Sequence, residues 1–276
     1  MSNVTVRAVS GTVFVLLMLS CLLFDKFLFA GLVIVIMSLM LVEFYHITMG
    51  ASYRFSKFLA ILAAIFLFGL LFAYSAYHIP IRFVALAMVP VFIVMVNSLY
   101  VQDKAEYGKL SNIYTGLLYI AVPMALSNLI AFDKTGHFSG LLLICFFVII
   151  WCSDVGAFVT GISLGRKFPG KLFPSVSPKK TWAGSAGGMA SAVLAAVLLY
   201  EFGILRFPLV HCIILAIVMN VSGVYGDLYE SQWKRVYGVK DSGNLIPGHG
   251  GLLDRFDSTL MAMPFGAIYL AIFDLL

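Results

Sequence analysis

Charged residues are scarce in this sequence of 276 residues. Asp, Glu, Lys and Arg together make up 11% of the chain, whereas hydrophobic residues make up 62%. A soluble domain carries roughly 25% charged residues, so this chain has too few charges to cover a surface that faces water. The composition therefore excludes an ordinary soluble globular protein and indicates a chain that crosses a membrane several times.

Other features are missing as well. The sequence has no linker-like composition, no low-complexity segment, no convincing internal repeat and no serine in a nucleophile-elbow motif. Its four cysteines lie inside apolar runs without metal-ligand spacing, and we interpret them as buried apolar side chains. The apolar runs are continuous rather than alternating, which excludes a β-barrel. Nothing resembles a nucleic-acid-binding module. We predict an all-α fold, a polytopic bundle of transmembrane helices.

The apolar runs are long enough to count as membrane spans. A helix needs about 20 apolar residues to cross a hydrocarbon core about 30 Å thick. Nine stretches qualify: 8–24, 27–47, 58–77, 81–101, 112–132, 138–163, 182–203, 207–229 and 259–276. The first stretch lacks a cleavage pattern, so we interpret it as a retained span. We expect residues 1–135 to hold about five spans and residues 136–276 the rest, within one structural unit.

Basic residues test the count of nine. With nine spans, fourteen of the eighteen Lys and Arg residues fall on the side of the N-terminus, and only Lys26, Arg82, Lys134 and Arg206 fall on the other. Short loops rich in Lys and Arg stay in the cytosol. We therefore predict a cytosolic N-terminus and an extracytoplasmic C-terminus. Nine of the fourteen basic residues lie in two cytosolic loops, 165–181 and 231–257.

The second of these loops is the most informative segment. From Gly226 the chain reads GDLYESQWKRVYGVKDSGNLIPGHGGLLDRFDS, with glycines gathered around the single residue His249. A solvated connector would explain the charges but not these glycines. Glycines in such density indicate a backbone that passes close to a ligand or adopts positive φ angles.

Several acids lie at or inside the apolar runs. Asp227 lies near the cytosolic end of the eighth stretch, Asp154 lies within the sixth, and Asp254 and Asp257 precede the last. A carboxylate inside the bilayer costs roughly 2.5–3.5 kcal/mol, so it usually faces a partner or a wet cavity. Hard cations prefer oxygen ligands, and the acids together predict a site for a divalent metal and phosphate. Two alternatives stay open: an ion pair of Asp227 with Lys234 or Arg235, and an ion-coupled transporter.

The loop 165–181 offers the complementary charge. Ser177 followed by Pro178 predicts a helix start, and Lys179 and Lys180 would then lie in its first turn. Cations are unfavourable there unless an anion binds as well, so we predict a phosphate contact. The alternative is simple anchoring by positive charge. Further along, Gly184 and Gly188 favour close helix packing.

These motifs resemble the phosphatidate cytidylyltransferases (CDP-diacylglycerol synthases). The resemblance rests on Ser231-x-x-Lys-Arg-x4-Lys240-Asp-x-Gly243-x3-Pro247-x-His-Gly-Gly251-x-x-Asp-Arg-x-Asp257, and on the runs that start at Ser177 and at Asp154. It covers about the C-terminal half, while the first five spans match only in being hydrophobic. Trp233 stands where an aliphatic residue is usual, and Ala183 where many members carry Glu or Gln.

The resemblance implies an enzyme that joins CTP and phosphatidic acid into CDP-diacylglycerol and pyrophosphate, with a divalent metal, usually Mg²⁺. It implies an active site on the cytosolic face of the inner (plasma) membrane, in contact with membrane lipid, and leaves a homodimer open. An alternative is another lipid enzyme that uses CTP, such as a polyprenol kinase. The expected catalytic residues are Asp227, Asp254, Asp257, His249, Lys240 and Asp241, with Asp227 and Asp254 as metal ligands. The expected substrate-binding residues are Ser177, Lys179, Lys180, Lys234, Arg235, Gly250, Gly251, Arg255 and Asp154.

Overall fold

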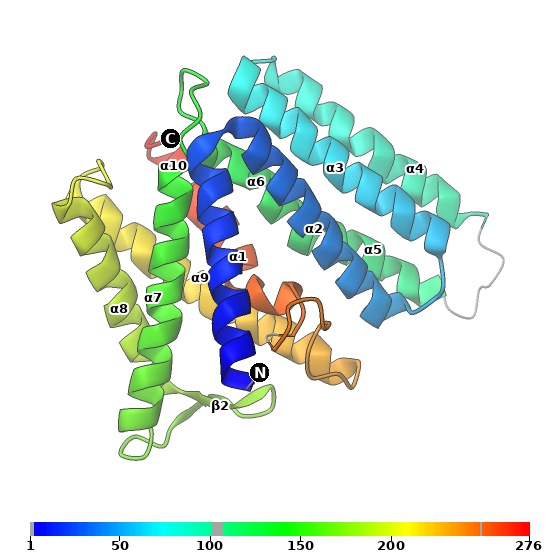
Figure 1. The fold of residues 1–276 in the computed structure, drawn as a ribbon. Helices are drawn as coiled ribbons and strands as arrows, with labels where there is room; N and C mark the ends of the chain where they lie inside the picture. Colours follow the sequence, from blue (N-terminus) through cyan, green and yellow to red (C-terminus); the bar gives the residue numbers. More distant parts are fainter. Residues whose placement is uncertain (1–2, 101–106, 249) are drawn as a thin grey trace. The chain divides into compact units, whose positions relative to one another are not determined.

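The computed structural model describes residues 3–100, 107–248 and 250–276 of the chain. The predicted fold class is confirmed, because the described residues form an extensive set of α-helices and one small two-stranded sheet (Figure 1). Seven of the described helical segments are long and apolar enough to cross a membrane, and Ala8–Phe24 and Asp257–Ile272 are shorter apolar helices. The protein is thus a multi-pass membrane protein, while the count of nine spans and the side of the N-terminus stay predictions.

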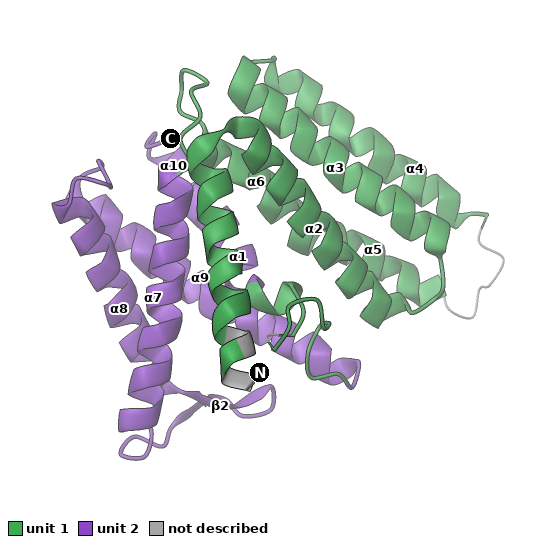
Figure 2. Cartoon of the chain, viewed as in Figure 1, with its two compact units in different colours: residues 1–140, 239–255 green, residues 141–238, 256–276 purple. Residues whose placement is uncertain are grey.

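The chain divides into two compact units (Figure 2). Unit 1 comprises Met1–Gly140 and Val239–Arg255, and unit 2 comprises Leu141–Gly238 and Phe256–Leu276. The glycine-rich segment thus belongs to unit 1, although the helices before and after it in the chain belong to unit 2. The organisation as one structural unit stays a prediction.

Unit 1 is built from the N-terminal helices. Its elements are α1 (Asn3–Phe24), α2 (Lys26–Met49), α3 (Arg54–Tyr77), η1 (Ile81–Ala87), α4 (Met88–Ser98), η2 (Tyr107–Leu110), α5 (Ser111–Gly116), η3 (Leu117–Ala121), α6 (Val122–Ala131) and η4 (Leu253–Arg255). Asp25 caps α2, since its Oδ1 accepts a hydrogen bond of 2.7 Å from Phe27 N. Aromatic rings join the helices of unit 1: the ring centroids of Phe29 in α2 and Phe68 in α3 lie 6.1 Å apart.

Unit 2 contains α7 (Leu141–Leu164), β1 (Lys171–Phe173), β2 (Ser177–Thr181), α8 (Trp182–Glu201), α9 (Leu209–Val236) and α10 (Asp257–Ile272). Small residues let α7 and α8 approach closely. A Cβ atom added to Gly184 would lie 3.0 Å from the carbonyl oxygen of Ala157, and one on Gly188 would lie 3.0 Å from that of Ser153. The close helix packing predicted from these two glycines is confirmed.

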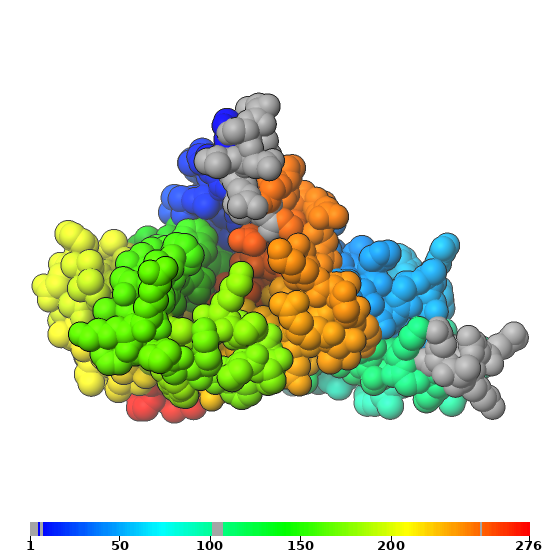
Figure 3. All heavy atoms as spheres, turned by 90° about the horizontal axis from the view of Figure 1, so that it is seen from below, coloured from blue at the N-terminus to red at the C-terminus, as the bar shows by residue number. Residues whose placement is uncertain are grey.

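The predicted helix start at Ser177 is wrong. Residues Ser177–Thr181 form strand β2, paired antiparallel with β1, and the helix begins at Trp182. Thr181 provides the cap, because its Oγ1 accepts a hydrogen bond of 3.0 Å from Gly184 N. Starting the helix here keeps Lys179 and Lys180 out of the first turn, where the helix dipole disfavours cations. The segment 165–181 lies on the face turned to the viewer in Figure 3, in green to yellow-green.

The loop predicted at 231–257 is shorter than expected. Helix α9 continues to Val236, so Ser231, Lys234 and Arg235 lie in the helix rather than in a loop. The apolar stretch ends near residue 229, but the helix continues, and Lys234 and Arg235 in its last turn interact favourably with the helix dipole. An ion pair between Glu230 and Lys234 at i,i+4 spacing also supports the extra turns.

Candidate active site

Lys180 and Asp227 form an ion pair in unit 2. The Lys180 Nζ lies 2.5 Å from Asp227 Oδ2, and the side chains are 25% and 32% exposed. Ser231, one turn further along α9, donates a hydrogen bond of 3.2 Å from its Oγ to the other carboxylate oxygen of Asp227. Strand β2 holds Lys180 in place, because the next residue is the Thr181 cap of α8. The pair is therefore well oriented and still reachable by a ligand.

Asp257 adds a second carboxylate to this cluster. It is the first residue of α10, and its Oδ1 accepts a hydrogen bond of 2.6 Å from Ser258 N. Asp257 interacts electrostatically with the charged side chains of Asp227, Asp154 and Lys234. Gly226 permits the close approach of the helices, since a Cβ there would lie 2.5 Å from the carbonyl oxygen of Asp257. Unit 2 thus gathers acids from α7, α9 and α10, with cations from β2 and α9.

Lys234 has a partner inside the protein. Its Nζ lies 3.3 Å from Oε1 of Glu230, whose side chain is fully buried. A buried carboxylate is strongly disfavoured without a neighbouring cation, so Lys234 compensates Glu230. The cation paired with Asp227 is Lys180, and Lys234 is paired with Glu230. The neighbouring Arg235 is exposed at the end of α9.

In unit 1 the segment 239–255, which we call the signature loop, folds back on itself. Asp254 Oδ2 accepts hydrogen bonds from Ser242 N at 2.8 Å and from Gly251 N at 2.9 Å. Gly248 and Gly250 have φ angles of +78° and +85°, in the left-handed region that favours glycine. The expectation that some of these glycines adopt positive φ is confirmed. The expectation that they approach a ligand stays a prediction.

Glu43, in α2, also belongs to the loop's surroundings, and the sequence analysis missed it. Its Oε1 accepts from Leu252 N at 3.0 Å, and its Oε2 accepts from Leu253 N at 2.9 Å and from the Ser242 hydroxyl at 3.2 Å. Glu43 is the one Asp or Glu between Lys26 and Gln102. That isolation in an apolar run was the signal that could have identified it, since a carboxylate costs roughly 2.5–3.5 kcal/mol there.

The predicted site residues fall into three groups. Unit 2 contains Asp154, Ser177, Lys179, Lys180, Asp227, Lys234, Arg235 and Asp257, and unit 1 contains Lys240, Asp241, Gly250, Gly251, Asp254 and Arg255. His249 lies outside the described residues. The structure brings Lys180, Asp227 and Asp257 together, whereas Lys179 is exposed on the strand. A shared metal role for Asp227 and Asp254 stays a prediction.

The carboxylates of Asp227 and Asp257 are suitable ligands for a hard divalent ion. Among the described residues no group of three or more His, Cys, Asp or Glu side chains is arranged to hold a metal. Mg²⁺, however, keeps several waters and commonly binds through one or two carboxylates together with substrate phosphates. Asp227 and Asp257 are neighbouring carboxylates of this kind, and they fit an ion that a phosphate ligand helps to bind.

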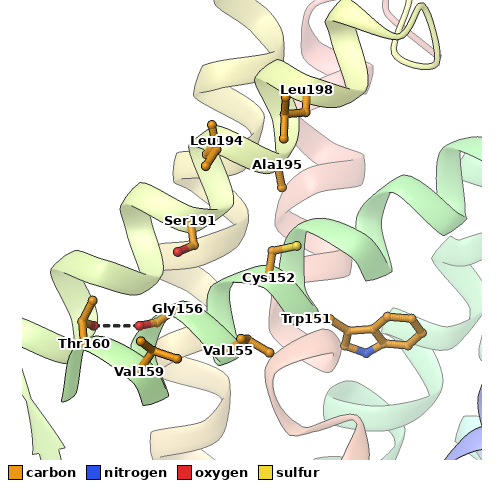
Figure 4. Close-up of a pocket in the computed structure, with 10 residues that line it drawn as sticks. All are labelled: Trp151, Cys152, Val155, Gly156, Val159, Thr160, Ser191, Leu194, Ala195 and Leu198. Atoms are coloured by element: carbon orange, nitrogen blue, oxygen red, sulfur yellow. Dashed lines mark hydrogen bonds between the residues drawn. The ribbon is translucent and has the colours of Figure 1, made fainter. Parts of the chain in front are cut away.

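A separate apolar groove lies between α7 and α8 (Figure 4). Its volume is about 480 Å³. The lining residues are Trp151, Cys152, Val155, Gly156, Val159, Thr160, Ser191, Leu194, Ala195 and Leu198. None of these side chains is charged, and the Thr160 hydroxyl donates to the carbonyl oxygen of Gly156 at 2.7 Å. The groove therefore suits an apolar ligand and not a phosphate.

Comparison with known proteins gives a consistent result. A family model described as the cytidylyltransferase family matches residues 5–273. Relatives named phosphatidate cytidylyltransferase include one from Bacillus subtilis, 38% identical over 68% of this chain, one from Rickettsia bellii, 37% identical over 54%, and one from Haemophilus influenzae, 41% identical over 46%. The chain spans 66%, 64% and 45% of the length of these three relatives.

Proposed function

The chain belongs to the cytidylyltransferase family, and we propose that it is a CTP:phosphatidate cytidylyltransferase. It transfers CMP from CTP to phosphatidic acid, which yields CDP-diacylglycerol and pyrophosphate. The relatives named above support this choice of substrates. The active site faces the cytosol from the inner membrane, where CTP is available and the lipid substrate resides.

The structural observation that supports the proposal is the cluster of Lys180, Asp227 and Asp257. It combines a reachable ammonium group with two neighbouring carboxylates. A nucleoside triphosphate and a lipid phosphate together bring several negative charges, which need cations from the protein or from a metal. The cluster offers both kinds of partner within one unit.

The reaction needs no nucleophile from the protein. An oxygen of the lipid phosphate attacks the α-phosphorus of CTP, a new P–O bond forms, and the bond to the β-phosphate breaks as pyrophosphate leaves. Lys180 can exchange the Asp227 carboxylate for a phosphate oxygen and so neutralise charge at the reacting groups. Catalysis then rests on positioning and on charge neutralisation.

A divalent ion, Mg²⁺ in our proposal, would be held by Asp227 and Asp257. When bound, such an ion neutralises charge on the phosphates. Asp227 would be available to it once Lys180 turns to the substrate, and Ser231 would still orient the carboxylate through its hydrogen bond. Asp254 carries two backbone hydrogen bonds on Oδ2, which gives that oxygen a role in ordering the signature loop.

The apolar groove is consistent with a lipid substrate. It lies along α7 and α8, both of which are long and apolar enough to cross a membrane. Asp154 lies on α7 between two groove residues, Cys152 and Val155, and its charge acts on Asp257. Helix α7 thus carries both a charged residue of the cluster and an apolar surface for an acyl chain.

The test uses the purified protein with phosphatidic acid and CTP labelled separately on the α- and γ-phosphates. The proposed function requires α-label and cytidine in the lipid product and γ-label in pyrophosphate, in equal amounts. Transfer of the γ-label to the lipid would identify a kinase instead. Absence of any labelled lipid, with added Mg²⁺ and lipid in mixed micelles, would overturn the proposal.

A further inference from the structure

Glu43 makes an unusual set of contacts for a residue in an apolar helix. Its neighbours Met40, Leu41, Phe44 and Tyr45 are at most 2% exposed, so the carboxylate emerges from a packed apolar core. Among the described residues, its three hydrogen bonds all reach the signature loop, about 200 residues away in the chain. We propose that Glu43 is a positioning residue that fixes the signature loop for substrate binding. This inference rests on the proposed function.

The three donors lie near the two ends of the loop. Ser242 is close to its start, whereas Leu252 and Leu253 are close to its end. A single carboxylate therefore ties both ends to one rigid helix. The eight residues from 243 to 250, which include two glycines with positive φ, lie between these attachment points.

A second set of hydrogen bonds joins the same residues to Asp254. The Ser242 hydroxyl donates to Glu43 and accepts a hydrogen bond of 3.3 Å from Asp254 N. Asp254 in turn accepts from Ser242 N and Gly251 N. Ser242 thus links Glu43 to Asp254 in one hydrogen-bond network, in which each residue holds a neighbour in place.

Two glycines of the loop lie against Glu43, and Gly251 also lies against the Ser242 hydroxyl. A Cβ on Gly243 would lie 2.5 Å from Glu43 Oε1, and one on Gly251 would lie 2.7 Å from Oε2. The loop backbone therefore lies directly against the carboxylate, with no space for a side chain. Such a fit indicates a site built around this acid and not a chance surface contact.

The contacts require a carboxylate in particular. All three groups that face Glu43 donate hydrogen bonds, and an ionised carboxylate only accepts. An amide at this position has one acceptor oxygen, and its NH₂ group would face either Leu252 N or Leu253 N. Aspartate keeps both acceptors but is one methylene shorter, so it can restore part of the network.

The anchored segments lie next to charged residues that we expect to bind substrate. Lys240 and Asp241 directly precede Ser242, and Asp254 and Arg255 directly follow Leu253. A loop released from Glu43 would present these groups in many arrangements, and the ligand would have to select the competent one. We therefore expect a weaker apparent affinity for CTP, with a smaller effect on the rate at saturation.

The experiment compares Glu43→Gln, Glu43→Asp and Ser242→Ala in the purified full-length protein. Glu201→Gln is the matched control, because it removes one exposed carboxylate at the end of α8. We expect Glu43→Gln to raise KM for CTP at least about tenfold while kcat falls less, and Glu43→Asp to recover part of the loss. Ser242→Ala should give a smaller increase, and its combination with Glu43→Gln should be less than multiplicative, since the two residues share a hydrogen bond.

Hydrogen exchange supplies a readout that does not depend on activity. In Glu43→Gln the amides of Leu252 and Leu253 should exchange at least about tenfold faster, while peptides from α3 keep their protection. Wild-type KM and wild-type loop exchange in this variant would overturn the inference. Equal loss of protection throughout unit 1 in both Gln and Asp variants would also overturn it, because Glu43 would then be a structural residue only. Faster loop exchange in a chain whose wild type makes no CDP-diacylglycerol would support the anchoring and refute the proposed function.

Discussion

The ion pair between Lys180 and Asp227 permits a prediction with a definite magnitude. If Lys180 binds a substrate phosphate, Lys180→Ala removes a hydrogen bond between charged groups, which contributes about 1.5–3 kcal/mol. Since each 1.4 kcal/mol or so corresponds to a factor of ten in rate, kcat/KM should fall about 10- to 150-fold. The side chains are 25% and 32% exposed, so water can solvate Asp227 in the variant and the loss of stability should stay below about 1 kcal/mol.

The assay measures CDP-diacylglycerol formation at varied CTP and phosphatidic acid, beside a thermal unfolding curve for each variant. Lys180→Arg should regain only part of the activity, because arginine carries a planar fork where lysine carries a compact ammonium. Lys167→Ala, on the same exposed segment, is the control for loss of one positive charge. Lys179→Ala should have a smaller effect than Lys180→Ala, since Lys179 is exposed and Lys180 contacts Asp227.

Two outcomes would refute this reasoning. Wild-type kinetics in Lys180→Ala would show that the ammonium group does not bind substrate. Equal losses in the Lys167, Lys179 and Lys180 variants would show that only the total charge of segment 165–181 matters, which is the anchoring alternative.

Three further predictions test the other parts of the proposal. Chelation of divalent ions should abolish turnover, and undiminished turnover in excess chelator would exclude the metal. Asp227→Asn should lower kcat about 100-fold with normal expression. A reporter at the C-terminus should be extracytoplasmic and one within 165–181 cytosolic, and a cytosolic C-terminus would disprove the count of nine spans. Val159→Trp should narrow the apolar groove, and it should lower kcat/KM at least about tenfold more for long-chain than for short-chain phosphatidic acid. Ile162→Trp, at an exposed position of α7 outside the groove lining, is the control. Equal losses for both lipids in Val159→Trp would exclude an acyl chain from the groove.

The helices were largely predictable, because continuous apolar runs leave few alternatives in a membrane. The ends of the helices were less predictable. Ser177 and Thr181 are both capping residues by type, and the choice between them depends on the pairing of β2 with β1, which the linear sequence does not reveal. The predicted end of α9 is also wrong, since the apolar stretch ends near residue 229 while the helix continues to Val236.

In unit 2 the sequence predicts which charged residues belong to the candidate site, but it does not predict which of them form ion pairs. The sequence offers an ion pair of Asp227 with Lys234 or Arg235 as an alternative, whereas in the structure Lys234 pairs with the buried Glu230 and Asp227 pairs with Lys180 from a distant strand. On α9, a lysine four residues after Glu230 is its natural partner. A contact between β2 and α9 depends instead on the tertiary arrangement of unit 2.

Glu43 shows how a sequence can point to a site residue outside its recognisable motifs. A carboxylate in an apolar run must gain interactions that offset its cost of insertion, and within the described part of unit 1 its three hydrogen bonds to the signature loop provide that gain. The same reasoning predicts that the first half of such a chain cannot be exchanged freely for other hydrophobic helices. Any replacement for α2 that lacks an acid at this position would leave the amides of Leu252 and Leu253 without their acceptor.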